Sequence, residues 1–444
     1  VRSLETPYQH LDLGKLGEQY NLYGNGSLLF SFPDTYTEQL TAHFWLSLHR
    51  DPKRILLLGG HGGRYVPAIL AHAPKRIDYV ELDSGVIEMT AQASGNDFRN
   101  ALERPTVHIH VTDGRRFVRE TNEQYDVVIS AMPDPSTALL NRFYTKEFYE
   151  EVRRVLAPNG IFITQVEAPG TFMRGEVGTY AASVYWTLRF AYPNTVLLPD
   201  GEIVFVSSVS PLPPLEQPEI FVKRLHDRGV SSRTFVPEAI LTKILPERAA
   251  TVQAELDNLE PEFLNSDSSP QSYLRRLVLW ARESGSDSLA VAIGWMDVHR
   301  RFLLFLLLLA ASVPWVFLGI APKVTSLTAC VAAAGCTGMG LEMLAIYMYQ
   351  NLYGCLYQEV GLLVAVFMGG LTVGARIGNW FARHLRGLTR LLLSFCAFTL
   401  LFTRIIEWIP DAGLSRAAGV SIYCGLILTA GILVGAVFPL AVSI

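Results

Sequence analysis

The residue types that could do chemistry gather in one stretch, between Ile55 and Asp83. A short apolar run, 55–58, is followed by four glycines that are interrupted only by His61. About 20 residues after the glycines come two acids, Glu81 and Asp83. Glycine lets a backbone approach a ligand closely, and a carboxylate accepts hydrogen bonds from ribose hydroxyls. This pattern favours a nucleotide or nucleoside site; the alternative is a βαβ unit whose glycines only form a tight turn.

The elements around the glycines indicate how they would be held. The apolar run is too short for a helix and long enough for a buried strand. An apolar-periodic segment follows, and a second strand, Ile77 to Leu82, ends at the two acids. We therefore expect a strand, a glycine turn, a helix and a strand, with the turn facing the ligand. The candidate ligand-binding glycines are Gly59, Gly60 and Gly62.

Further candidates follow other predicted strands. Asp113 precedes Gly114 after the strand Val107 to Val111, and it is either a ligand contact or part of an ordinary turn. Asp134 lies in a proline-rich loop after the strand in YDVVISAMPDPS, and it either contacts a polar substrate or caps a turn. His61 is either a base or donor toward a ligand, or a turn histidine that faces solvent.

The composition divides the 444-residue chain into two parts. Residues 1 to about 300 have the pattern of a soluble α/β protein, and from Phe302 on the composition is that of a membrane protein. All five cysteines lie in the second part, so the first part has no disulfide framework. The net charge of −4 does not indicate nucleic acid binding, and we expect neither a nucleic acid partner nor a metal site. Because the chain starts on Val1 and stops inside an apolar run, we expect it to be a piece of a longer protein.

Strands that alternate with helices predict a doubly wound, mostly parallel sheet of the Rossmann type, with the ligand at the carboxyl ends of the strands. An Asn-Gly pair at residues 25–26 predicts a β-hairpin before this sheet. The expected domains are an N-terminal β region at 1–50, a Rossmann-like domain at 51–210, a helical extension and linker at 211–300, and an all-α transmembrane domain at 301–444.

Five apolar runs predict membrane spans, because a helix needs roughly 20 apolar residues to cross a bilayer. The runs are Phe302 to Ala321, Val324 to Gln350, Val360 to Ala375, Leu391 to Thr403 and Ala417 to Ile444. The second run contains the lone charge Glu342, which we expect to be held by a polar partner such as Arg376 or Arg404.

Glycines recur every four residues in two of these runs, a spacing that lets helix backbones pack closely in lipid. They are Gly370, Gly374 and Gly378, and then Gly431 and Gly435. The alternative is that glycine is simply common in such helices. Four arginines between the third and fourth runs favour a cytoplasmic loop there, but Arg300 and Arg301 before the first run argue the other way. The side of the membrane on which the soluble part lies therefore stays open.

Together these motifs resemble the spermidine synthase family of polyamine aminopropyltransferases, in particular its membrane-fused bacterial branch. Tyr8-Gln9 resembles the family's opening motif, GGHGG its glycine loop, VELD its ribose-binding strand end and Asp113-Gly114 its adenine-contacting turn. LNSDSSPQSY and the apolar stretch that begins GLEMLAIYMYQ are similar to the fused branch specifically. The resemblance implies a class I methyltransferase-type fold in which Gln9, Glu81, Asp113 and the glycines hold a nucleoside. It also implies decarboxylated S-adenosylmethionine as cosubstrate, or methylthioadenosine as product, and no tightly bound cofactor.

Three positions depart from the family pattern. The family has an aspartate where this chain has His61, another at the start of its catalytic loop where this chain has Ala131, and a tyrosine where this chain has Leu198. Carboxylates hold the cationic amine, and one of them accepts its proton, which an alanine cannot do. The resemblance thus implies a retained nucleoside pocket and a depleted amine pocket, with Asp134 and His61 as the remaining catalytic candidates.

Two functions follow as alternatives. The favoured one is a membrane-anchored, catalytically degenerate protein that acts as an accessory or structural subunit of a membrane assembly. The other is an active aminopropyltransferase that uses decarboxylated S-adenosylmethionine and a polyamine. In either case we expect a multi-pass protein of the lipid bilayer, in a bacterial inner membrane, with membrane-protein partners or a second copy of itself.

Overall fold

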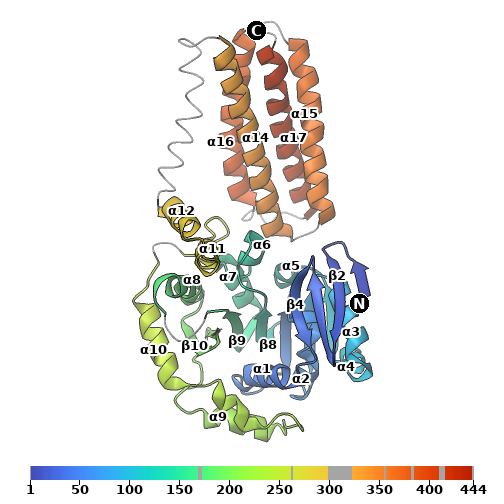
Figure 1. Ribbon diagram of the computed structural model, residues 1–444, viewed down its shortest axis with the longest axis vertical. Coiled ribbons are helices and arrows are strands. Elements are labelled where there is room, and N and C mark those ends of the chain that lie inside the picture. The colour runs from blue at the N-terminus through green and yellow to red at the C-terminus, as the bar shows by residue number, and fades with distance from the viewer. Residues whose placement is uncertain are drawn as a thin grey trace. The chain divides into compact units, whose positions relative to one another are not determined.

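The computed structural model describes residues 2–168, 173–261, 264–298, 323–354, 357–381, 385–409 and 416–442. The chain forms two compact units, Val1–Val291 and Ala292–Ile444. The first unit contains both sheets with their helices, and the second unit is helical (Figure 1).

The chain begins with a four-stranded antiparallel sheet. Its strands follow the chain order: β1 Arg2–Glu5, β2 His10–Leu16, β3 Gln19–Gly24 and β4 Ser27–Phe32. Asn25 and Gly26 join β3 to β4 with φ values of 50° and 80°, the left-handed backbone that a tight hairpin turn requires. The hairpin prediction is therefore confirmed. One face of the sheet buries Leu11, Leu22 and Phe32 against the helix that follows β6.

The second sheet has seven strands in the order β10-β11-β9-β8-β5-β6-β7. The strands are β5 Arg54–Gly59, β6 Arg76–Glu81, β7 Val107–Val111, β8 Tyr125–Ala131, β9 Leu156–Val166, β10 Asn194–Asp200 and β11 Glu202–Ser208. The five strands from β5 to β9 are parallel, and the hairpin of β10 and β11 adds two antiparallel strands at one edge. The predicted doubly wound sheet of Rossmann type is thus confirmed.

Helices cover both faces of this sheet (Figure 1). They are α1 Thr35–Ser47, η1 His61–Gly63, α2 Val66–Leu70, α3 Ser84–Ser94, α4 Asn96–Leu102, α5 Gly114–Glu120, α6 Ala138–Asn141, α7 Lys146–Val155 and α8 Gly175–Ala191. Leu56 and Leu58 pack into one apolar core with α7 and α8, while Ile55 and Leu57 pack into the other with α1 and α2. Because alternate residues of a strand point to opposite faces, β5 is apolar throughout and buried on both sides.

The polar extension after the sheet packs onto the same core. It contains α9 Glu219–Asp227, η2 Pro237–Thr242, α10 Pro246–Asp257, α11 Gln271–Glu283 and α12 Asp287–Val298. Val252 and Leu256 of α10 and Leu279 of α11 belong to the apolar cluster that contains Phe162 of β9. These two helices are therefore part of the first unit's core, and α11 matters for the site described below.

The second unit contains α14 Lys323–Tyr353, α15 Tyr357–Phe381, α16 Leu385–Trp408 and α17 Arg416–Val442. Among the described residues, three stretches are long and apolar enough to cross a membrane: Leu327–Tyr353, Glu359–Trp380 and Ala417–Val442. They correspond to the second, third and fifth predicted spans. The fourth predicted span lies within α16, which is not one of the three, and the first, Phe302 to Ala321, lies outside the described residues.

Glycines bring α15 and α17 into backbone contact. A Cβ atom added to Gly374 would lie 2.1 Å from the carbonyl oxygen of Ile432, and one added to Gly435 would lie 2.3 Å from that of Leu371. No real Cβ atom approaches a carbonyl oxygen so closely. Gly370, Gly378 and Gly431 meet the facing backbone in the same way. The glycine spacing therefore reflects close helix packing rather than simple abundance.

Replacing Gly374 with Leu should separate α15 from α17 and destabilise the second unit. We expect a loss at the upper end of the about 1–3 kcal/mol typical of overpacking, because backbone atoms cannot move aside as a flexible side chain can. Gly369→Leu is the matched control, since it lies on the same helix and an added Cβ there meets nothing within 4 Å. Thermal unfolding in detergent measures both variants; equal melting temperatures would contradict this packing.

Glu342 is buried in α14, with 9% of its surface exposed. The predicted pairing of its carboxylate with Arg376 or Arg404 does not occur among the residues that the structure describes. The side chain of Arg376 instead lies exposed on α15.

Two buried histidines form a hydrogen-bonded pair in the first unit. His43 Nδ1 lies 2.9 Å from His72 Nε2, and Arg228 Nη1 lies 3.0 Å from His72 Nδ1. A guanidinium can only donate, so His72 accepts at Nδ1 and donates at Nε2 to His43. Burial lowers the pKa of His43 to about 4 and that of His72 to about 2. Both imidazoles are therefore neutral at pH 7.

This pair should make the first unit less stable in mild acid. Below pH 6.5 the unfolded histidines take up protons that the folded ones do not, so the free energy of unfolding falls by about 1.4 kcal/mol per pH unit for each histidine. Urea unfolding of the whole chain between pH 7 and pH 5, followed by tryptophan fluorescence, measures this slope. The variant His43→Leu/His72→Leu should show a smaller slope, and an unchanged slope would exclude the pair as its source.

Candidate functional site

The predicted ligand-binding residues meet at one edge of the seven-stranded sheet. Gly59 ends β5, Glu81 ends β6, Asp113 follows β7 and Asp134 follows β8. These four parallel strands are neighbours in the order β8-β5-β6-β7, so their carboxyl ends lie side by side. Ala131, which stands where the family pattern has an aspartate, pairs with Gly59 at the same edge.

The glycine loop needs its glycines for conformational reasons. Gly59, Gly60 and Gly62 have φ values of 70°, 98° and 72°, which side chains rarely adopt. At Gly62 a Cβ would also lie 2.4 Å from Thr90 Oγ1. The loop therefore forms a tight turn, and its contact with a nucleoside stays a prediction.

His61 lies in this turn with its ring against Phe30, 5.1 Å between centroids. Burial, with a smaller contribution from the Arg64 charge, lowers the pKa of His61 to about 4, so the imidazole is neutral at pH 7. Arg64 Nη2 lies 3.0 Å from His61 Nδ1 and can only donate to it. The proton of the neutral ring then sits on Nε2. In this arrangement Nε2 of His61 can donate a hydrogen bond, which is one of the roles toward a ligand considered from the sequence, and that role stays a prediction.

The nucleoside candidates form a connected group at the tip of β6. Glu81 accepts hydrogen bonds from the Leu82 backbone N–H at 2.8 Å and from the Tyr79 hydroxyl at 3.1 Å. Burial raises the pKa of Glu81. Gln9 Nε2 donates to Asp83 at 3.0 Å, which ties the N-terminal sheet to this tip. Oε1 of Glu81 also accepts the Asp83 backbone N–H at 3.5 Å, so Oε2 is the oxygen that can accept a further hydrogen bond, such as one from a ribose hydroxyl.

Asp113 is engaged on both carboxylate oxygens. Oδ1 accepts the Arg116 backbone N–H at 3.0 Å and caps α5, while Oδ2 forms an ion pair with Arg142. Asp113 and Arg142 are 5% and 3% exposed. The turn alternative from the sequence therefore describes its present role, and an adenine contact would need an additional lone pair of the same carboxylate.

Asp134 is held equally firmly. Its Oδ1 accepts the Glu167 backbone N–H at 2.9 Å, and its Oδ2 accepts Arg276 Nε at 3.1 Å. Burial is the main cause that raises the pKa of Asp134 to about 6. The second candidate acid thus faces an internal cation from α11, which the sequence did not reveal.

A cavity of about 740 Å³ opens beside this edge, between α1, the glycine loop, the ends of β9 and β11, and α11. His61 and Leu198, two of the three departures from the family pattern, line it. Of the other candidates, Gly59, Gly60, Gly62, Gln9, Glu81, Asp113 and Asp134 do not line it. The cavity therefore adjoins the glycine loop at His61.

Two acids in this cavity were missed by the sequence reasoning. Glu167 follows β9 and Glu202 begins β11, and the pairing of Ile203 with Val166 places the two acids at neighbouring positions of adjacent strands. Among the described residues, neither carboxylate has an ion pair or a hydrogen-bond donor. Burial, and then the charge of Glu167, raises the pKa of Glu202, while the charge of Lys243 lowers it by a smaller amount.

The remaining charges of the cavity are paired. Lys243 Nζ lies 2.7 Å from Asp200 Oδ2, and Arg276 Nη1 lies 3.2 Å from Glu283 Oε2. The unpaired carboxylates are thus those of Glu167 and Glu202. The sequence could have indicated Glu167 as a site residue, because it directly follows a predicted strand at the carboxyl end, where ligands bind in such sheets. Glu202 gave no comparable signal, because its strand runs antiparallel to the others.

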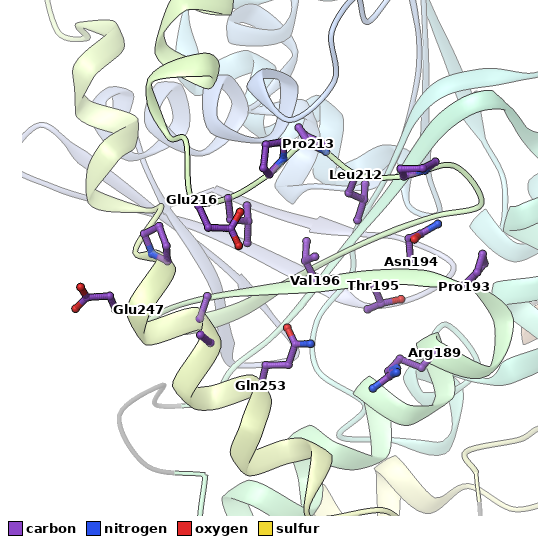
Figure 2. A pocket seen from close by; sticks show the side chains of 16 residues that line it. Arg189, Pro193, Asn194, Thr195, Val196, Leu212, Pro213, Glu216, Glu247 and Gln253 are labelled. Atoms are coloured by element: carbon purple, nitrogen blue, oxygen red, sulfur yellow. The ribbon is translucent and has the colours of Figure 1, made fainter.

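A second cavity, of about 670 Å³, lies away from this edge (Figure 2). It is bounded by β10, α10 and the proline-rich segment 211–216. Figure 2 shows Arg189, Glu216 and Glu247 on different sides of it, and Arg189 is paired with Asp257 at 2.8 Å. It contains none of the predicted site residues. Among the described residues, no group of three or more histidine, cysteine or acidic side chains could hold a metal ion.

Comparison with known proteins covers the part of this site that includes the glycine loop, Glu81 and Glu167, but not Glu202 or Arg276. Residues 34–199 match the family model described as the spermine/spermidine synthase domain. The polyamine aminopropyltransferase of Oceanobacillus iheyensis is 31% identical over 202 residues, which are 44% of this chain and 37% of that protein. That of Saccharolobus solfataricus is 31% identical over 187 residues, which are 40% of this chain and 60% of that protein. The match thus spans less than two thirds of either relative.

Two solved structures are similar to this chain at lower identity. Spermidine synthase from Thermotoga maritima is 19% identical, with a TM-score of 0.45 over 58% of this chain and 87% of that chain. A spermidine synthase in complex with the transition state analogue AdoDATO is 20% identical, with a TM-score of 0.47 over 58% of this chain and 88% of that chain. From the family match and the curated relatives, the chain carries a spermine/spermidine synthase domain.

Proposed function

We propose that the first unit is an aminopropyltransferase that binds a cationic amine in the cavity lined by Glu167 and Glu202. The observation that carries the proposal is that these two neighbouring carboxylates have no partner among the described residues. Like charges on adjacent strands cost stability. An ammonium group bound between them would offset that cost, and charge-assisted hydrogen bonds are the strong ones. The domain match and the names of the curated relatives support the same reaction.

The reaction needs a nucleoside donor beside this amine. The donor would be decarboxylated S-adenosylmethionine. Glu81 would accept a hydrogen bond from its ribose, and the backbone of the glycine loop would lie close to the donor. The acceptor nitrogen loses a proton and attacks the carbon bonded to the sulfonium sulfur. The carbon–sulfur bond then breaks, its electron pair stays on sulfur, and methylthioadenosine leaves.

Proton removal falls to the acids that line the cavity. Ala131 offers no carboxylate, and Asp134 is covered by Arg276. Glu202 is the better base, because it lines the cavity and burial raises its pKa toward the working pH. In this proposal Glu167 holds the ammonium group and Glu202 accepts the proton.

A second function is favoured by two specific observations. The missing acid at Ala131 and the ion pair between Arg276 and Asp134 both reduce catalytic power. They support a degenerate domain that serves as an accessory or structural subunit of a membrane assembly. The apolar helices of the second unit would then anchor it in a lipid bilayer, such as a bacterial inner membrane, beside membrane-protein partners or a second copy of the chain.

One assay separates the two functions. The purified full chain in detergent is incubated with decarboxylated S-adenosylmethionine and putrescine, and methylthioadenosine and spermidine are quantified. An aminopropyltransferase should form both products in equal amounts, at a rate on the order of 1 per second. Absence of any amine-dependent methylthioadenosine would favour the accessory subunit.

A further inference from the structure

Arg276 brings a positive charge into the cavity of about 740 Å³ that Glu167 and Glu202 line, which is called the acceptor cavity below. It does so from outside the matched domain. It lies on α11, beyond the residues 34–199 that match the family model. Its side chain lines the cavity, is 16% exposed, and bridges Asp134 and Glu283 at 3.1 Å and 3.2 Å. One guanidinium therefore pairs both with Glu283, which lines the cavity, and with Asp134, which does not line it while Arg276 is in place.

The position of Arg276 is fixed by the loop that precedes α11. Asp267 of this loop forms two hydrogen bonds, of 2.7 Å and 2.8 Å, with the fully buried Arg115. Asn265 Nδ2 donates to the Tyr144 carbonyl oxygen at 2.9 Å, and Asn265 Oδ1 accepts the Ser272 N–H at 3.1 Å. These contacts fasten the start of α11 to the sheet domain. Arg276, one helical turn further, is thus presented to the cavity by a rigid element.

We propose that Arg276 determines acceptor length, as a tethered cation that stands where a further ammonium group of a long polyamine would bind. The inference rests on the proposed amine-binding function of the cavity. With Asp134 and Glu283 neutralised, only Glu167 and Glu202 remain to receive an ammonium group. A diamine fills both places, because one nitrogen is held by Glu167 and the other gives its proton to Glu202. A triamine carries one further ammonium group, which would meet the guanidinium.

Removing this charge should therefore favour longer amines. Putrescine and spermidine are titrated calorimetrically into the full chain in detergent, as wild type and as Arg276→Met. We expect Arg276→Met to bind spermidine at least about tenfold more tightly than wild type, with a clearly smaller change for putrescine. Arg276→Lys keeps the positive charge and should show a smaller gain. Arg282→Met is the matched control, because Arg282 lies on the same helix and pairs with Glu176 and Asp287 outside the cavity.

A second background tests whether Asp134 is the group released. In Asp134→Asn/Arg276→Met the charge of that carboxylate is absent, so most of the gain for spermidine should disappear. Arg276→Gln keeps a donor toward Asp134 and serves as the variant of choice if the methionine variant does not fold. An unchanged ratio of spermidine to putrescine affinity in both Arg276→Met and Arg276→Gln would overturn the inference while leaving amine binding intact. Failure of every variant and of wild type to bind either amine would overturn the proposed function as well.

Discussion

Replacing Glu202 with Gln is expected to lower kcat/KM for the amine acceptor by about 100- to 10,000-fold. The change keeps the shape of the side chain and removes the carboxylate that would accept the proton of the acceptor nitrogen. General acid–base catalysis typically contributes a factor of about 100 to 10,000. In wild type the carboxylate faces the cavity without a partner among the described residues, so no internal ion pair is broken by the substitution.

The pH dependence gives this prediction a second readout. Burial raises the pKa of Glu202, the charges of Glu167, Asp134 and Asp200 raise it further, and the charge of Lys243 lowers it. Proton acceptance requires the ionised form of Glu202. kcat/KM of wild type should therefore fall as the pH drops through that raised pKa, and the part of the acid limb due to Glu202 should vanish in Glu202→Gln. Glu247→Gln is the control, since Glu247 lines the second cavity. Equal kinetics and equal pH profiles for wild type and Glu202→Gln would exclude Glu202 from the acceptor site.

Replacing Arg115 with Met should destabilise the first unit by about 3–5 kcal/mol, the typical cost of breaking a buried ion pair from one side. Arg115 is fully buried and contacts Glu151 and Asp267 through two hydrogen bonds each, between 2.7 Å and 2.9 Å. Its removal takes away the guanidinium that these two partly buried carboxylates share, although Glu151 keeps its ion pair with Arg119 at 2.8 Å. Because Asp267 precedes α11, the loss should also loosen the helix that carries Arg276.

The neighbouring arginine provides the control for this substitution. Arg116 forms an ion pair with Glu120 on the surface of α5, and such pairs contribute at most about 1 kcal/mol. Urea unfolding of the full chain in detergent, followed by tryptophan fluorescence, should therefore separate Arg115→Met from Arg116→Met by more than about 2 kcal/mol. A similar midpoint for the two variants would mean that the Arg115 network does not support the fold.

Local signals in the sequence predicted much of the sheet. The strand at Val107–Val111 and the hairpin at Asn25 and Gly26 lie where the sequence places them, because alternation and turn chemistry are properties of neighbouring residues. The extension was harder to interpret. The sequence predicted a helical extension and linker at 211–300, but not that Val252 and Leu256, one helical turn apart, pack into the main core.

The contents of the acceptor cavity could not be predicted in the same way. The ion pair of Arg276 with Asp134 joins residues 142 positions apart, and no local pattern announces it. Glu202 reaches Glu167 only through the antiparallel pairing of β11 with β9. Comparing positions with a family pattern identified the acids that are absent, such as the one at Ala131. It did not identify the acids that stand nearby on other strands, which only the fold brings together.

Calorimetric titration of putrescine into the full chain tests the acceptor site most directly. Wild type should bind one putrescine per chain, with a Kd within the range of about 1 μM to 1 mM in which enzymes commonly have their KM values. The variant Glu167→Gln/Glu202→Gln, which keeps both side-chain shapes and removes both charges, should lose this binding. No saturable binding by wild type, or equal binding by wild type and the double variant, would contradict an amine site at these two carboxylates.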